Sequence, residues 1–274
     1  MKLLFARHLW GVSAPYHESL KKFKNEGYTA IEAGLMYSAE SPGELTAQLN
    51  DLDLKWIPMV FTQGKSVGEH LASFAAQINE VASYQPLLIN AHSGRDAFTR
   101  TEAETFYREA LKIEADFGIP IAHETHRSRT FYNPWITRDI LLEFPGLKLC
   151  CDYSHWVTVC ERLIDEESDI LKLCAERCLH IHARVGYEQG PQVPDPRAPE
   201  YQSYVEAHER WWDIIWDTQM KSGRDYLTLT PEFGPAPYLQ VLPHTSEPVA
   251  SLEDICLWQM QRQRSRFMRR QAAG

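Results

Sequence analysis

Short apolar runs alternate with longer stretches of helical period along the whole chain. The apolar runs, rich in β-branched residues, predict buried strands, and the stretches between them are typical of helices packed by one face. The expected strands are Lys2–Leu9, Ala30–Gly34, Lys55–Phe61, Leu87–His92, Pro120–His126, Lys148–Tyr153, Cys178–Val185 and Tyr226–Phe233. The expected helices occupy residues 16–26, 42–52, 66–84, 101–117, 135–143, 163–176, 200–222 and 250–270.

Several expected helices carry start and stop signals. Ser41-Pro42 places proline at the first helical position. Thr101, followed three residues later by Glu104, predicts a capping box. Glycines that can take a left-handed conformation are expected just after helix ends. They are Gly27, Gly118 and Gly223.

Eight consecutive βα units predict a single (β/α)₈ barrel over residues 1–274. A closed barrel needs no sheet edges, and right-handed crossovers place every helix outside. An open doubly wound sheet usually has a glycine-rich turn after its first strand, and the segment HLWGVS lacks that pattern. The longest stretch without helical period, at about residues 186–199, is rich in proline and predicts an ordered, irregular loop at the active face.

Composition and charge exclude several classes of function. The formal net charge of -9 opposes binding to a nucleic-acid backbone. The chain has no apolar run long enough for a membrane span, and its first residues reach Arg7 and His8 too early for a signal peptide, so we expect a soluble, cytoplasmic protein. The six cysteines are expected to be reduced core thiols. The arginine-rich end, RQRSRFMRRQ, is expected to complement a helix dipole or to meet an acidic neighbouring subunit.

Candidate metal ligands stand at the carboxyl ends of four consecutive expected strands. These segments read IAHETHR, LCCDYSHW, LHIHARVG and LTPEFGP, and they supply Glu124, Asp152, His180 or His182, and Glu232. Side chains at this end of a barrel strand face the site. Carboxylates that share one pocket repel each other unless a cation lies between them. Three carboxylates and one imidazole therefore predict a divalent metal site for Mn²⁺, Mg²⁺ or Co²⁺.

The segment HETH resembles the zinc-protease motif HExxH only superficially. Its histidines, His123 and His126, are three residues apart rather than four, and they lie in a strand rather than a helix. A protease is therefore excluded.

Other polar and aromatic residues at the same strand ends are expected to bind a substrate. His155 follows Asp152 where the strand is expected to give way to a loop, and a surface histidine is the alternative. Arg184 can bind a substrate oxygen or a developing oxyanion, or it can form an outer salt bridge. Further candidates are His126, Asn90, His92 and Trp10, with Glu32 and His8 as weaker ones.

At these residues the chain resembles the xylose isomerase-like barrel superfamily, specifically its sugar phosphate isomerase/epimerase group. The matching pieces are Glu124, Asp152 with His155 in DYSH, His182 in HIHARVG and Glu232 in PEFG, and the layout matches over nearly the whole chain. The resemblance implies Mn²⁺ or a similar ion as cofactor, held by Glu124, Asp152, His182 and Glu232. It also implies that Glu124 and Glu232 form the catalytic acid/base pair and that His155 binds substrate.

Two positions depart from the ketose epimerases of that group. Those enzymes place a substrate-binding Glu six residues after the first ligand and an Arg six residues after the ligand histidine. Thr130 and Glu188 stand at these positions here. We expect Arg184 or Arg127 to replace the missing contacts.

The expected reaction follows from the chemistry of such a site. A divalent metal bound to a carbonyl and its neighbouring hydroxyl acidifies the adjacent C–H bond by stabilising an enediolate. One glutamate removes the proton, and return by the other gives epimerisation or isomerisation of a small sugar or keto-sugar. A lyase or dehydratase acting on a keto-sugar or keto-glycoside, an endonuclease-like phosphodiesterase and a non-catalytic carbohydrate-binding protein are the alternatives. We expect a homo-oligomer or a site completed by a partner subunit.

Overall fold

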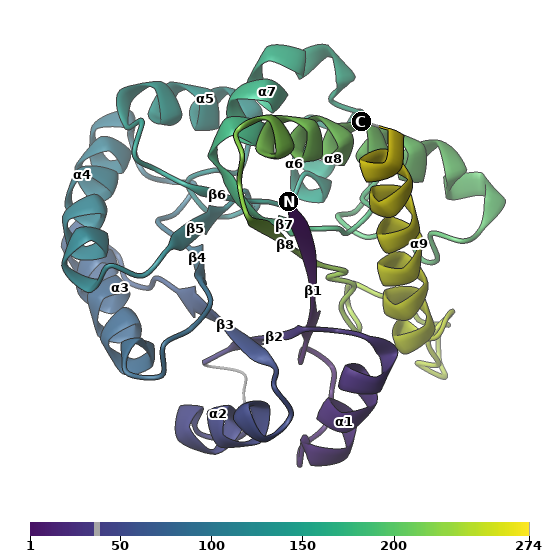
Figure 1. Cartoon of the computed structure of the whole chain (residues 1–274). Coiled ribbons are helices and arrows are strands. Elements are labelled where there is room, and N and C mark those ends of the chain that lie inside the picture. Colours follow the sequence, from purple (N-terminus) through teal and green to yellow (C-terminus); the bar gives the residue numbers. More distant parts are fainter. Residues whose placement is uncertain (36–38, 274) are drawn as a thin grey trace.

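The strands form a closed parallel barrel whose order follows the sequence from β1 to β8 (Figure 1). The computed structural model describes residues 1–35 and 39–273. Pairing of β1 with β8, beginning at Lys2 and Tyr226, closes the ring. The fold class predicted from the sequence is thereby confirmed. The strands are β1 Lys2–His8, β2 Ala30–Gly34, β3 Lys55–Phe61, β4 Ile89–His92, β5 Ile121–Glu124, β6 Leu149–Cys151, β7 Cys178–His182 and β8 Tyr226–Thr230.

Helices surround the barrel on the outside, as the view along its axis shows (Figure 1). Between the barrel wall and the helices lies the main apolar core, which includes the fully buried Trp211, Trp212 and Trp216 of one helix. The α-helices are α1 His17–Glu26, α2 Pro42–Asp51, α3 Val67–Ala82, α4 Arg100–Phe117, α5 Pro134–Glu143, α6 Ser154–Cys160, α7 Ser168–Arg177, α8 Gln202–Lys221 and α9 Leu252–Ala273, and the 3₁₀ helices are η1 Asp165–Glu167 and η2 Pro199–Tyr201.

The capping box of α4 lies one step earlier than the sequence analysis placed it. The Thr99 hydroxyl accepts a hydrogen bond from the Glu102 backbone N–H, and the Glu102 carboxylate accepts one from the Thr99 N–H. The prediction of Thr101 with Glu104 was therefore wrong. Two overlapping T-x-x-E patterns occur in TRTEAE, and the helix uses the first of them.

Six of the predicted strands were too long, and one helix was missed. Strand β4 begins two residues later than predicted, whereas β1 and β5 to β8 end one to three residues earlier, because the chain must leave the barrel to reach the next helix. His155, expected in a loop, lies in the first turn of α6. This short helix was overlooked because its seven residues, SHWVTVC, have no side-chain cap and span only two turns.

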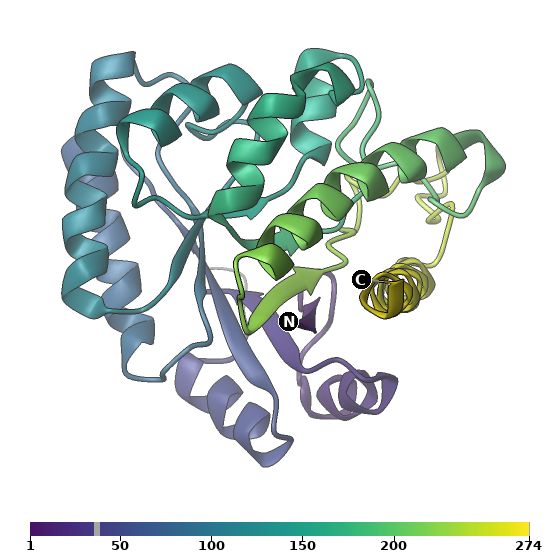
Figure 2. The ribbon, with the colours of Figure 1, turned by 45° about the horizontal axis from the view of Figure 1, so that its top comes forward.

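The arginine-rich end packs against the protein's own chain. In α9, Arg262 pairs with Glu209, Arg266 with Asp213 and Arg270 with Asp217, at N–O distances of 2.7, 2.8 and 2.5 Å. These acidic partners all lie on α8, beside α9 (Figure 2). Arg270 also lies in the last turn of α9, where it complements the helix dipole as expected, and contact with a neighbouring subunit stays a prediction.

Residues 186–198 form an irregular loop with one isolated bridge, between Tyr187 and Gly190, and η2 begins at Pro199. The Gln192 side-chain amide donates to the backbone C=O of Gly234, after β8, and accepts from the Gly234 N–H. The loop is thus fixed to the carboxyl side of the barrel. In the part of the chain that the structure describes, no helix is long and apolar enough to cross a membrane.

Candidate metal centre

The four predicted metal ligands converge on one point at the carboxyl end of the barrel. Glu124 and His182 are the last residues of β5 and β7, whereas Asp152 and Glu232 follow β6 and β8. One ligand atom from each lies within 4.8 Å of the others, and all four residues are buried. The Nδ1 atom of His182 faces all three carboxylates, at 2.9 Å from Glu232, 3.6 Å from Glu124 and 3.9 Å from Asp152.

Unpartnered polar atoms at this point fit a cation. Glu124 Oε1 is buried and makes no hydrogen bond within residues 1–35 and 39–273. Glu232 Oε2 and His182 Nδ1 are buried too, and they contact each other and, for Glu232, Arg184 without forming a hydrogen bond. Buried polar atoms normally have a partner, and leaving one without costs about 1–3 kcal/mol. A divalent ion bound by these atoms removes that cost and the mutual repulsion of the carboxylates. The oxygen-rich donor set suits a hard ion such as Mn²⁺ or Mg²⁺.

The electrostatics of the site also favour a positive charge at its centre. Burial lowers the pKa of His182, but the acidic groups around it, Cys150 and Glu232 foremost, raise the pKa well above its usual value. Burial raises the pKa of Asp152 to about 6, against the opposing effect of Arg184. Burial likewise opposes ionisation of Glu124, but His92 and His182 outweigh it and hold its pKa well below the usual range. Glu124 is therefore a carboxylate at neutral pH.

Arg184 is the nearest cation to the ligands among the described residues and is itself fully buried. Its Nη2 lies 2.5 Å from Asp152 Oδ2 and 3.3 Å from Glu232 Oε2. The same nitrogen lies 2.6 Å from His155 Nε2. Arg184 thus forms an inner ion pair with the ligands rather than an outer salt bridge, and one of its faces borders the cavity described below.

Glu32 and Asn90 form a layer that orients the ligands from below. Glu32 Oε1 lies 3.0 Å from His182 Nε2, and its Oε2 accepts a hydrogen bond from the Thr230 hydroxyl. Asn90 donates to Glu32 at 3.1 Å and to Glu124 at 2.8 Å. A carboxylate bound to the distal ring nitrogen of a ligand histidine fixes its tautomer and orientation. Asn90 lies beneath the cavity described below and does not line it, so its predicted role in substrate binding stays a prediction.

The remaining histidines form a cluster beside Glu124. His92 Nε2 lies 2.8 Å from Glu124 Oε2, and the rings of His92 and His126 are 4.8 Å apart. His126 in turn lies over His155, with ring centroids 3.9 Å apart. Burial holds the pKa values of His126 and His155 well below the usual range, so both rings are neutral. His155 lies behind Arg184 and does not border the cavity, and its contact with substrate stays a prediction.

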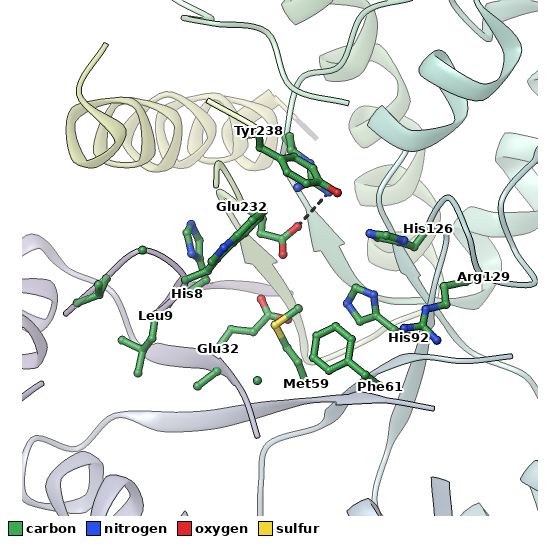
Figure 3. A pocket seen from close by; sticks show the side chains of 16 residues that line it. His8, Leu9, Glu32, Met59, Phe61, His92, His126, Arg129, Glu232 and Tyr238 are labelled. Carbon is green, nitrogen blue, oxygen red and sulfur yellow. Dashed lines mark ion pairs between the residues drawn. The ribbon is translucent and has the colours of Figure 1, made fainter. Parts of the chain in front are cut away.

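A cavity of about 420 Å³ reaches the metal centre at Glu232, which is the one of the four ligands that lines it. Figure 3 shows Glu232, His92 and His126 pointing into it, and Arg184 and Trp10 also line it. Sequence reasoning missed Tyr238, which covers one side of the cavity and lies under the Arg184 guanidinium at 4.9 Å. Its place in the loop after β8 was the available signal, because the βα loops of a barrel surround the site.

Several solved structures share the fold of this chain, and their names describe different activities. D-allulose 3-epimerase from Methylomonas sp. superposes with a TM-score of 0.61 at 13% identity over 97% of this chain and 98% of that one. A xylose isomerase-like TIM barrel protein from Mycobacterium smegmatis in complex with magnesium gives 0.58 and 14% over 82% and 89%. Endonuclease IV from Thermus thermophilus gives 0.59 and 14% over 97% and 99%.

These likenesses confirm the (β/α)₈ barrel fold predicted from the sequence. At such low identity they show the fold alone, and proteins of that fold do not share one reaction. The amino-acid sequence matches no protein-family model and no curated protein sequence.

Proposed function

We propose that this protein is a divalent-metal-dependent isomerase or epimerase that moves a proton on a small hydroxyketone such as a keto-sugar, with Mn²⁺ as the favoured ion. The convergence of Glu124, Asp152, His182 and Glu232, with three of their donor atoms buried and without a hydrogen bond among the described residues, carries this proposal. The bound ion supplies Lewis acidity to the carbonyl and hydroxyl oxygens of the substrate. The epimerase among the structural neighbours adds support from analogy of fold.

We assign proton exchange with the substrate to the two glutamates. Glu124 comes from β5, and Glu232 follows β8 on another side of the ring. Glu124 Oε2 is held by Asn90 and His92, which leaves Oε1 to bind the ion, and we assign removal of the proton from carbon to the Glu124 carboxylate. Glu232 lines the cavity and returns the proton on the other face of the same carbon or to the neighbouring carbon. Arg184 faces the developing negative charge on the substrate oxygen.

Proton exchange with solvent tests the proposal directly. The Mn²⁺-loaded protein is incubated in D₂O with a panel of ketoses, and ¹H NMR follows loss of the signal from the carbon next to the carbonyl. We expect exchange and formation of an epimer or aldose with at least one ketose. Loss of water from the substrate instead of inversion assigns the lyase alternative, and no exchange with any ketose contradicts the proposed substrate class.

The variant Glu124→Gln isolates the base. General bases contribute about 10²–10⁴-fold to rate, so exchange should fall by at least a hundredfold. Glu80→Gln, at an exposed position of α3, is the matched control and should retain full activity. Full activity of Glu124→Gln would remove Glu124 from the mechanism.

A further inference from the structure

The cavity above the metal centre has two chemically different sides. Polar groups from the later strands, including His92, His126 and Glu232, line one side. The first three strands and the loops that follow them line the other, where His8 and Glu32 lie beside apolar residues. In Figure 3, Leu9 and Met59 lie across the cavity from His126. The apolar lining of that side consists of Leu9, Val12, Ala33, Met59 and Phe61.

The apolar side is unsuited to the hydroxyl groups of a bare sugar. Leu9, Ala33 and Met59 are 6%, 4% and 7% exposed, and the Met59 thioether, a weak acceptor, is the one hydrogen-bonding group of these three side chains. A buried hydroxyl without a partner costs about 1–3 kcal/mol. A sugar carries a hydroxyl on nearly every carbon. Each sugar carbon placed against this side would therefore bury another hydroxyl without a partner. An apolar group placed there instead gains free energy from its burial.

Aromatic rings give the apolar side flat walls. Trp10 and Tyr238 meet edge to face with centroids 4.9 Å apart, and the Phe61 ring stacks on His92 at 4.3 Å. Trp10 is fixed against Gly234, where an added Cβ would approach the indole ring to 2.2 Å. Rings held in this way favour a planar ligand group by stacked or edge-to-face contact.

We propose that the natural substrate joins an oxygen-rich head, which binds at the metal centre, to a flat apolar tail such as an aryl group, which lies against Leu9, Met59 and Phe61. This inference rests on the proposed function, because the metal centre must hold the head. The volume of about 420 Å³ lies within the range of pockets that take ligands of drug size. Such a substrate satisfies both sides of the cavity at once.

Two small hydroxamates test the inference in the unmodified protein. Acetohydroxamate and benzohydroxamate present the same pair of metal-binding oxygens and differ in a methyl against a phenyl group. Isothermal titration calorimetry of the Mn²⁺-loaded protein should show benzohydroxamate binding at least tenfold more tightly. The variant Met59→Gln, which places an amide in the apolar side, should remove most of this preference and leave the affinity for acetohydroxamate within about twofold. Met268→Gln, on the surface of α9 and 63% exposed, is the matched control and should keep the preference.

The outcomes separate this inference from the proposed function. Equal binding of the two hydroxamates overturns the inference of an apolar substrate tail and still supports the metal centre. A phenyl preference that persists in Met59→Gln places the ring elsewhere and also overturns the inference. If neither compound binds the Mn²⁺-loaded protein, the metal centre itself is contradicted and the inference falls with it.

Discussion

Glu32 Oε1 lies 3.0 Å from Nε2 of His182, and this contact leaves the other ring nitrogen of His182, Nδ1, facing Glu232 at 2.9 Å. Glu32 is fully buried. Burial disfavours its charge, but His182 and His180 outweigh that effect and hold the pKa of Glu32 well below the usual range. A buried carboxylate therefore directs the one nitrogen ligand of the site towards the three oxygen ligands.

Replacing this carboxylate should weaken the metal site without removing a ligand. Loss of such an outer partner typically costs about 10–100-fold in metal affinity. We expect Glu32→Gln to raise the Kd for Mn²⁺ by at least tenfold, measured by competition with a chelating dye. Glu80→Gln serves again as control. An unchanged Kd would show that Glu32 does not orient His182.

Metal binding should stabilise the fold. A ligand at a hundred times its Kd adds about 2.7 kcal/mol to the free energy of unfolding, which for a domain of this size raises Tm by roughly 5 °C or more. We expect Mn²⁺ to produce this shift, EDTA to reverse it and Asp152→Asn to abolish it. Asp169→Asn, at an exposed position of α7, should retain it. A shift of equal size in Asp152→Asn would place the ion elsewhere.

His208 should make the stability depend on pH. Its Nδ1 donates to the Tyr204 carbonyl at 2.9 Å, and its Nε2 accepts from the Gly186 N–H at 3.3 Å. Burial lowers the pKa of His208 to about 4, below its ordinary value of 6.5. The unfolded chain therefore takes up the proton first, and stability that is complete above pH 6.5 is lost as the pH falls towards 4.

The two pKa values of His208 correspond to roughly 3 kcal/mol of unfolding free energy. In urea unfolding of the wild type, His208 should lower the free energy of unfolding by about this amount between pH 7 and about pH 4.5. Other titrating groups contribute further changes. His208→Gln should have a flatter profile, whereas His17→Gln, at an exposed position, should follow the wild type. Parallel profiles for wild type and His208→Gln would contradict the assignment.

The ion pairs between α8 and α9 should contribute to stability. Arg266 lies 2.8 Å from Asp213 and 3.4 Å from Glu209, and its guanidinium covers the ring of Trp216. Because these groups are largely shielded from solvent, we expect Arg266→Met to lower the free energy of unfolding by about 1–2 kcal/mol. Arg269→Met, at an exposed position, should change it by less than about 0.5 kcal/mol. Chemical denaturation of both variants measures the difference, and equal stabilities would show that these ion pairs are neutral.

Local signals in the sequence were sufficient to predict the barrel and the four candidate ligands that converge in it. Strand and helix periods are properties of short segments, so their alternation could be followed along the chain. The carboxyl ends of parallel strands meet at one mouth, which placed Glu124, Asp152, His182 and Glu232 together before any coordinates. Boundaries were less accurate, because capping depends on which of two overlapping signals the helix uses, as Thr99 and Thr101 show.

The sequence by itself determined the fold class and the identity of the residues at the mouth of the barrel. Only the tertiary structure decided how these residues pair. Glu32 and His182 are 150 residues apart, and Arg184 and Asp152 are 32 apart, so their contacts depend on the closure and stagger of the barrel. The apolar side of the cavity could not be predicted either. In the sequence, Leu9, Met59 and Phe61 look like core residues, and only the packing shows that their side chains line the cavity.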